Sequence, residues 1–212
     1  MRGDEVNEGD RYGEDYFLRG QATGLSLYTD YRWLESLTIP MARAIVGHLG
    51  IKKWDRILDF GCARGYLVRA LRELGYSAFG TDISFWAVNH ADEAMRDYLF
   101  WKTMPPVLFD WIIAKDVMEH VVELSEILIH LMRTTRNLFI VVPLSDQYGE
   151  PYVVPDYEKD ITHRHRMPLE AWINAVQLAG EEAGGQCHVD GYHRVEGIKD
   201  NYFKPGWEKA NG

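Results

Sequence analysis

The stretch from Arg56 to Asp82 constrains the fold more than any other, because it predicts a strand, a glycine turn, a helix and a second strand in succession. Its first residues, RILDF, form a short, mostly apolar run that is typical of a buried parallel strand leading into a tight turn. After Gly65, aliphatic residues recur at helical spacing as far as Gly75, which can end the helix. Residues 78–81 then predict the second strand, with Asp82 at its tip.

The glycine turn and this acid predict half of a nucleotide-type binding site. Glycine at positions 61 and 65 lets the backbone approach a ligand, and the following helix offers free N–H groups to polar or anionic atoms. Asp82 comes seventeen residues after Gly65, at the strand end where such folds hold the two ribose hydroxyls. A dinucleotide site fits poorly, since its pattern would require glycine in place of Ala63 and Tyr66.

The rest of the chain predicts a doubly wound α/β fold with a mostly parallel sheet. Residues 110–117 and 137–144 are apolar runs of strand length, and leucine and isoleucine at helical spacing between them predict a crossover helix. Further helices are expected at 38–50 and 168–184, and a terminal antiparallel hairpin from Val189–Val195 and a stretch near Tyr202. No strand can be identified between the helix that Ser84 caps and residue 108.

Composition limits the class of protein and of partner. A chain of 212 residues with 46% hydrophobic content predicts one globular domain. The sequence contains no stretch of eighteen apolar residues, so no membrane span is predicted. Without an apolar N-terminal signal, a soluble cytoplasmic protein is expected. A net charge of −9 argues against nucleic acid as partner and favours a small or neutral one. The two cysteines predict free thiols, and oligomeric state is left open.

Three motifs in the right order make the chain resemble the class I S-adenosylmethionine-dependent methyltransferases. These are DFGCARG at 59–65, Asp82, and DVMEHV at 116–121. The family's first motif has glycine where this chain has Ala63, the smallest possible departure. A late string, YEKD-x-THRHRMPLEAW, is similar to methyltransferases that act on sugars of cell-surface polysaccharides.

The resemblance implies the cofactor, the residues that bind it and a domain plan. The cofactor is S-adenosyl-L-methionine, and the implied contacts are Asp59, Gly61, Cys62, Ala63, Gly65, Asp82, Ile83, Asp116 and Tyr16. The adenine contact is left open among Tyr98, Leu99 and Phe100. Residues 1–34, polar and aromatic, would form a cofactor lid, residues 35–212 the methyltransferase domain, and residues 145–167 its substrate loop.

A hydroxyl acceptor needs its proton removed, and a well-placed histidine contributes ~10²–10⁴-fold to such a step. His163 is the first candidate, because its loop should cross the site at the carboxyl ends of the strands. His120, just after the strand that ends at Asp116, is the second, and His165 is the third. The alternative for each is a polar loop histidine bonded to a backbone carbonyl.

A metal site is a further alternative. Asp116, Glu119 and His120 form an acid-x-x-acid-His string, similar to that of small-RNA 2′-O-methyltransferases that bind Mg²⁺-like ions, and His163 could complete it. The first acid of the string is Asp116 where the compared string has glutamate, and the shorter aspartate side chain argues against a metal site. No metal is therefore expected. The sequence therefore predicts methyl transfer to a hydroxyl or amine of a small molecule, with a sugar as first candidate. The alternatives are a metal-assisted RNA 2′-O-methyltransferase and a non-catalytic, cofactor-binding partner subunit.

Overall fold

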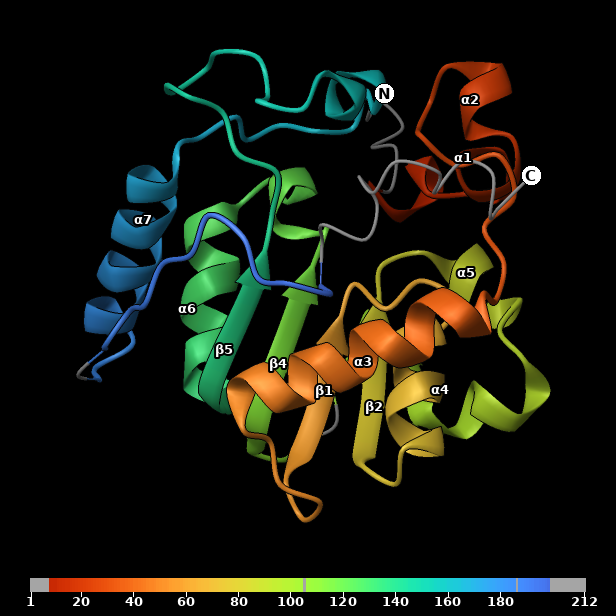
Figure 1. Cartoon of the computed structure of the whole chain (residues 1–212), viewed down its shortest axis with the longest axis horizontal. Coiled ribbons are helices and arrows are strands. Elements are labelled where there is room, and N and C mark those ends of the chain that lie inside the picture. The colour runs from red at the N-terminus through yellow and green to blue at the C-terminus, as the bar shows by residue number, and fades with distance from the viewer. Residues whose placement is uncertain (1–7, 105, 186, 199–212) are drawn as a thin grey trace, which may run out of the picture.

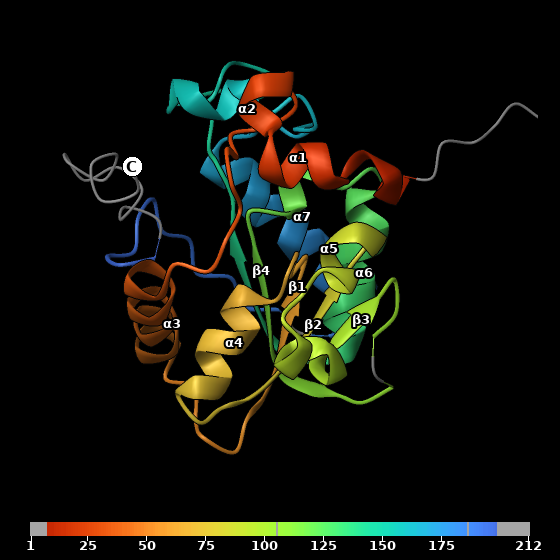
Figure 2. The ribbon, with the colours of Figure 1, turned by 90° about the vertical axis from the view of Figure 1, so that its right-hand side faces the viewer.

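A five-stranded parallel sheet forms the centre of the protein in a computed structural model that describes residues 8–104, 106–185 and 187–198. The strand order is β3-β2-β1-β4-β5, and every neighbouring pair is parallel. Figure 1 shows β2, β1, β4 and β5 side by side, and β3 is labelled in Figure 2. The strands are β1 (Arg56–Phe60), β2 (Ser77–Asp82), β3 (Leu99–Trp101), β4 (Phe109–Lys115) and β5 (Thr135–Val141). The chain reverses its direction of winding beside β1, which confirms the predicted doubly wound fold.

Helices cover both faces of the sheet. Figure 2 shows α3 (Glu35–Leu49) and α4 (Tyr66–Glu73) on one face, with α6 (Leu124–Thr134) and α7 (Leu169–Glu182) on the other. The short helix α5 (Phe85–Asn89) follows β2. Two short helices, α1 (Glu14–Leu18) and α2 (Gly20–Thr23), lie with the segment after β5 above the carboxyl ends of the strands (Figure 1). Four 3₁₀ turns complete the described elements: Glu8–Arg11, Glu93–Tyr98, Met118–His120 and Pro155–Lys159.

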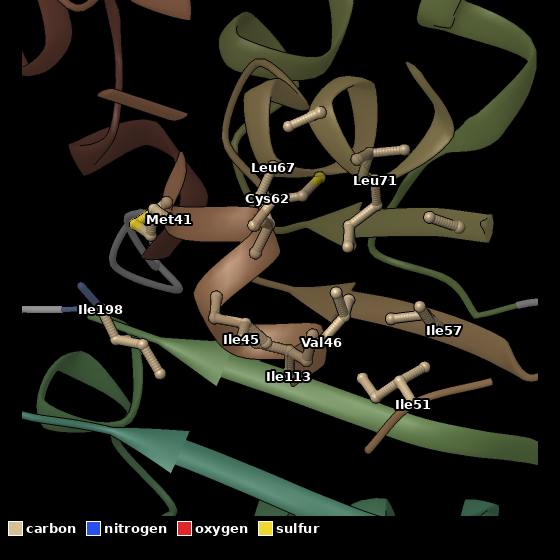
Figure 3. Close-up of a cluster of buried hydrophobic side chains, with 14 of the residues drawn as sticks. Met41, Ile45, Val46, Ile51, Ile57, Cys62, Leu67, Leu71, Ile113 and Ile198 are labelled. Carbon is tan, nitrogen blue, oxygen red and sulfur yellow. The ribbon is translucent and has the colours of Figure 1, made fainter. Parts of the chain in front are cut away.

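Alternation along the strands divides the core between the two faces. Ile57 of β1 and Ile113 of β4 belong to the cluster under α3 and α4, where Ile45 of α3 and Leu71 of α4 lie over them (Figure 3). The neighbouring strand residues Leu58 and Ile112 belong to the opposite cluster, with α6 and α7. Because successive side chains of a strand point to opposite faces, two adjacent apolar residues are buried in two different layers.

Local differences from the sequence predictions have local causes. The strand that the sequence did not reveal is β3, whose three residues are too few for a recognisable periodicity. Helix α3 begins at Glu35, before Thr38. Residues 189–195 form no strand, and Tyr202 lies outside the described residues, so the terminal hairpin is not part of the described fold. No helix among the described residues is long and apolar enough to cross a membrane.

Candidate functional site

The turn after β1 is held in a left-handed backbone conformation. The φ angles are +78° at Gly61, +48° at Ala63 and +76° at Gly65. The N–H groups of Gly61 and Cys62 both donate to the carbonyl of Thr81, at 2.8 and 3.1 Å, which fixes the turn against the end of β2. A Cβ atom added at Gly61 would lie 2.4 Å from Cγ2 of Val117, so no larger residue fits there. Ala63 adopts the left-handed conformation without being glycine, which costs on the order of 1 kcal/mol.

Asp82 faces this turn from the carboxyl end of β2. Its Oδ2 accepts a hydrogen bond from the Ala63 N–H at 2.7 Å, and its Oδ1 accepts one from the Ser84 N–H at 2.7 Å. Burial raises the pKa of Asp82, while the N–H groups of Ser84, Ala63 and Ile83 act in the opposite direction. Each carboxylate oxygen has a further lone pair beyond these bonds, which is the acceptor capacity that a ribose diol requires.

Asp59 forms a buried charge cluster with its neighbours on adjacent strands. Burial, and then the charge of Asp82, raise the pKa of Asp59 to about 7, while the ammonium group of Lys115 acts to lower it. Lys115, with a side chain only 8% exposed, forms an ion pair with Asp116 at the end of β4. Asp116 itself has a φ of +55°, a conformation that aspartate tolerates better than most residues. Lys115 was not predicted as a site residue, although it immediately precedes the motif at 116–121.

Two of the predicted cofactor contacts point away from the turn or lie at its rim. The Cys62 side chain is buried against Gly80 and belongs to the core cluster under α3 and α4, so only its backbone faces the turn. Burial raises the pKa of the Cys62 thiol well above its usual range. The Ile83 side chain is 40% exposed, and its carbonyl accepts a hydrogen bond from Trp101 Nε1 at 3.0 Å.

The N-terminal segment packs directly on the glycine turn. Tyr16 and Phe17 of α1 form a buried cluster with Ala63 of the turn and Ala87 of α5. The Ser84 hydroxyl donates to the carbonyl of Tyr12 at 2.5 Å. The predicted lid segment therefore lies over the turn, and Tyr16 is buried there with a pKa raised well above its usual range by desolvation.

The same segment is joined to the loop between β5 and α7. The Tyr16 hydroxyl donates to Asp160 Oδ2 at 2.7 Å, the Ile161 N–H donates to the Leu25 carbonyl at 3.3 Å, and Arg164 pairs with Glu8 at 2.8 Å. Residues 8–34 and 145–167 thus lie together over the carboxyl ends of the strands, and these two segments are called the roof (Figure 1).

The three candidate histidines have different environments. His165 Nε2 lies 2.7 Å from the carbonyl oxygen of Val121. A carbonyl oxygen only accepts, so this nitrogen donates, and His165 fits the alternative prediction of a loop histidine bonded to a backbone carbonyl. His120 and His163 are adjacent, with ring centroids 4.5 Å apart. His120 Nδ1 lies 2.8 Å from the hydroxyl oxygen of Thr162. Burial lowers the pKa of His163, whereas the nearby carboxylate of Glu119 acts in the opposite direction.

Glu119 joins these two histidines in the residue group that could hold a cation. Its side chain is 1% exposed, and Oε1 lies 4.0 Å from His163 Nε2. One ligand atom each from Glu119, His120 and His163 lie within 4.8 Å of one another. Asp116, the first acid of the sequence string, is instead ion-paired with Lys115.

Asp160 and Thr162, which were not predicted as site residues, lie between the histidines and the N-terminal segment. Both are buried, at 5% and 7% exposed, and Thr162 donates its hydroxyl to Asp160 Oδ1 at 2.6 Å. Their signal was present in the run DITHRH, which places an acid and a hydroxyl immediately before the candidate histidine.

Comparisons with known proteins give matches in sequence and in fold. A family model described as a methyltransferase domain matches residues 37–182. A curated relative, the type II methyltransferase M.TthHB8I of Thermus thermophilus, is 31% identical over 105 residues, which are 47% of this chain and 24% of the relative. The chain thus spans about a quarter of the length of that relative.

Solved structures share the fold at low sequence identity. A chain from the complex between the Haloferax volcanii Trm112 methyltransferase activator and a methyltransferase superposes with a TM-score of 0.58 and 17% identity, over 81% of this chain and 75% of its own. Phosphoethanolamine N-methyltransferase 2 of Haemonchus contortus, solved with S-adenosyl-L-methionine, gives 0.51 and 18%, over 66% of this chain and 36% of its own. At these identities the likeness shows the fold alone.

Proposed function

Because the chain belongs to the methyltransferase-domain family, we propose that it transfers a methyl group from S-adenosyl-L-methionine to a hydroxyl, or to an amine, of a small molecule, with a sugar as first candidate. The observation that carries this proposal is the pairing of Asp82 with the glycine turn. A carboxylate with spare lone pairs faces a left-handed turn at the carboxyl edge of a parallel sheet, where ligands of such folds bind.

The residues at this edge fit the cofactor in chemical type. Asp82 offers charged acceptors for ribose hydroxyls, and the backbone of Gly61 to Gly65 leads into α4, whose first turn has no side-chain cap. Asp59 is near the carboxyl end of β1, Ala63, Ile83 and Asp116 follow the carboxyl ends of β1, β2 and β4, and Tyr16 packs in one cluster with Ala63. When bound, S-adenosyl-L-methionine supplies an activated methyl group on a sulfonium, so the protein has only to orient the acceptor and accept its proton.

The bonds that fix the roof in place favour a small molecule as the acceptor. Hydrogen bonds from the Arg164 and His165 N–H groups to the Glu119 carbonyl, at 2.8 and 3.2 Å, hold the 145–167 loop down on the strand ends. The bidentate pair of Arg166 and Glu158, at 2.8 to 3.2 Å, stiffens the loop further. A loop fixed in this way can select an acceptor by shape, and His163 and His120 are the candidate proton acceptors beside it.

Two other functions are less well supported. An RNA acceptor would have to approach a chain of net charge −9, which opposes phosphate binding. A non-catalytic partner subunit would keep the cofactor-binding edge but would not need two adjacent histidines and a buried glutamate under the roof.

The test has two arms. Calorimetry should show binding of S-adenosyl-L-methionine and S-adenosylhomocysteine but not of NAD, since the turn and Asp82 suit one adenosine. Incubation with S-adenosyl-L-methionine labelled on its methyl group and a panel of nucleotide-activated sugars should then give a labelled sugar. Tight binding of NAD would refute the cofactor assignment, and binding without transfer to sugars or to small alcohols and amines would favour the partner subunit.

A further inference from the structure

A chain of hydrogen bonds runs from the N-terminal segment to the imidazole of His120. The Tyr16 hydroxyl donates to Asp160 Oδ2 at 2.7 Å, and the Thr162 hydroxyl donates to Asp160 Oδ1 at 2.6 Å. The Thr162 N–H also donates to Oδ1, at 2.9 Å. His120 Nδ1 lies 2.8 Å from the Thr162 hydroxyl oxygen. Because Asp160 and Thr162 are buried, water competes little for these bonds.

This chain determines which nitrogen of His120 carries the proton. A threonine hydroxyl has one proton, and here Asp160, which as a carboxylate can only accept, takes it. The Thr162 oxygen can therefore only accept from His120, so Nδ1 is the nitrogen that bears hydrogen. In the neutral imidazole the lone pair is then at Nε2, the form that accepts a proton.

His163 is held differently. Its Nδ1 makes no hydrogen bond within the described part of the chain, and its Nε2 is 4.0 Å from the Glu119 carboxylate, too far for one. Its side chain is 5% exposed. Among the described residues, no hydrogen bond therefore selects a tautomer of His163.

We propose that His120 is the general base of this site and that Thr162 and Asp160 are its positioning residues, held in place by Tyr16 of the N-terminal segment. This inference rests on the proposed methyl transfer and assigns the proton acceptor within it. His163 packs against the His120 ring.

The proton balance is simple. The acceptor's O–H bond breaks as its oxygen bonds to carbon, and the C–S bond of the donor breaks to leave a neutral thioether. The one proton released goes to Nε2 of His120. The imidazolium keeps its Nδ1–H bond to Thr162, is stabilised through it by the Asp160 charge, and later returns the proton to water.

The groups around His120 are consistent with this role. Glu119 and His163 lie within 4.8 Å of it, the Tyr12 ring meets it edge-on at 6.0 Å, and Asp160 acts through Thr162. The N-terminal segment contributes Tyr12 to this set, and its Tyr16 holds Asp160. The bond from the Tyr16 hydroxyl to Asp160 joins the N-terminal segment, which packs on the turn, to the residues that position His120.

Nitrogen-resolved NMR of the histidines, with the protein saturated with S-adenosylhomocysteine, tests the tautomer directly. The wild type should show neutral His120 protonated at Nδ1. Thr162→Val, which keeps the shape but removes the hydroxyl, should lose this preference, and Thr162→Ser should restore it. A wild-type His120 protonated at Nε2, or a tautomer unchanged in Thr162→Val, would overturn the proposal.

Turnover on a sugar labelled by the wild type tests the catalytic consequence. His120→Ala should lower kcat ~10²-fold or more with cofactor affinity within about twofold, and Thr162→Val should lower it less, with rescue by Thr162→Ser. Asp160→Asn should move the acidic limb of the kcat/KM profile to lower pH, because the imidazolium loses a stabilising charge. Tyr16→Phe, which keeps the ring, should have the mildest effect.

The outcomes separate this inference from the proposed function. If the wild type methylates no acceptor, the proposed function fails, while the NMR result still decides the tautomer. If the wild type is active but His163→Ala abolishes turnover and His120→Ala does not, the base is His163 and this inference is wrong.

Discussion

The two halves of the carboxyl edge are built by different means. In the half around β1 and β2, where we propose that the cofactor binds (the cofactor half), the key bond joins Ala63 to Asp82, nineteen positions apart within one βαβ unit. In the half around His120 and residues 145–167, where we propose that the acceptor binds (the acceptor half), the bonds join His120 to Thr162 across 42 positions and Tyr16 to Asp160 across 144. A site made by neighbouring elements is fixed by local turn chemistry, whereas a site made by distant loops depends on the whole fold.

The cofactor half should therefore be the more sensitive to a change in the backbone. We expect Gly61→Val to abolish binding of S-adenosylhomocysteine, because the added Cβ would lie 2.4 Å from Val117 in a residue with φ of +78°. Gly50→Val is the matched control, since Gly50 has φ of +65° with no atom within 4 Å of the added Cβ. Urea unfolding should show the Gly61 variant less stable than the control by about 1–3 kcal/mol. Wild-type affinity in Gly61→Val would show that the turn does not form the site.

A second difference between the halves is charge, and it makes stability depend on pH. Asp59 has an ordinary pKa of 3.8 that rises to about 7 in the fold, so the folded state binds its proton more tightly than the unfolded state. The stabilisation from this group is complete below the unfolded pKa and is lost as pH rises through the folded one. Asp59→Asn should therefore increase the free energy of unfolding at pH 8 by up to about 4 kcal/mol and change it little at pH 4.

Urea denaturation of the cofactor-free protein at several pH values measures this. Equal destabilisation of the Asp59→Asn variant at pH 4 and pH 8 would mean that Asp59 is ionised at both, held so by Lys115. Such a result would mean that the pKa of Asp59 is not raised in the folded protein and that Asp59 forms an ordinary ion pair with Lys115.

The same contrast explains how far the sequence could be read. The β1 turn, α4 and Asp82 were predictable because their signals are local: glycine positions, helical spacing and an acid at a strand end. The predicted doubly wound sheet is likewise confirmed, because apolar runs of strand length alternate with helical stripes. The conformation of Ala63, φ +48°, explains why the family's glycine at this position is replaceable only at some cost.

The acceptor half could be predicted only in part. DITHRH marked the loop and His163, but nothing local shows that Thr162 would orient His120 or that Asp160 would meet Tyr16. Lys115 was hidden for the same reason, since its effect on Asp59 depends on the pairing of β1 with β4. Short β3 carries too little periodicity to be recognised as a strand, and the strand predicted at Val189–Val195 does not form.

A smaller effect should sharpen the contrast within the cofactor half. We expect Asp82→Ala to weaken S-adenosylhomocysteine binding by ~1–3 kcal/mol, because ribose hydroxyls lose a charged acceptor. Asp82→Asn should weaken it less, since one oxygen remains to accept a hydrogen bond. Calorimetry gives both values, and unfolding curves show whether the Ala63 and Ser84 N–H groups, left without their acceptor, destabilise the turn. Unchanged affinity in both variants would remove Asp82 from the site.

The smallest expected effect concerns metal in the acceptor half. Glu119, His120 and His163 lie close enough to surround a cation, yet they offer only one carboxylate, whereas Mg²⁺ prefers oxygen ligands. Asp116, which would supply a second carboxylate, is held by Lys115. We therefore expect EDTA to leave turnover and the unfolding midpoint unchanged, and added Mg²⁺ or Mn²⁺ to have no effect. Two imidazoles with one carboxylate would suit Zn²⁺ better, so Zn²⁺ is the informative addition. Loss of turnover in EDTA with recovery in any of these ions, abolished by Glu119→Gln, would make the three side chains ligands and the acceptor half a metal site.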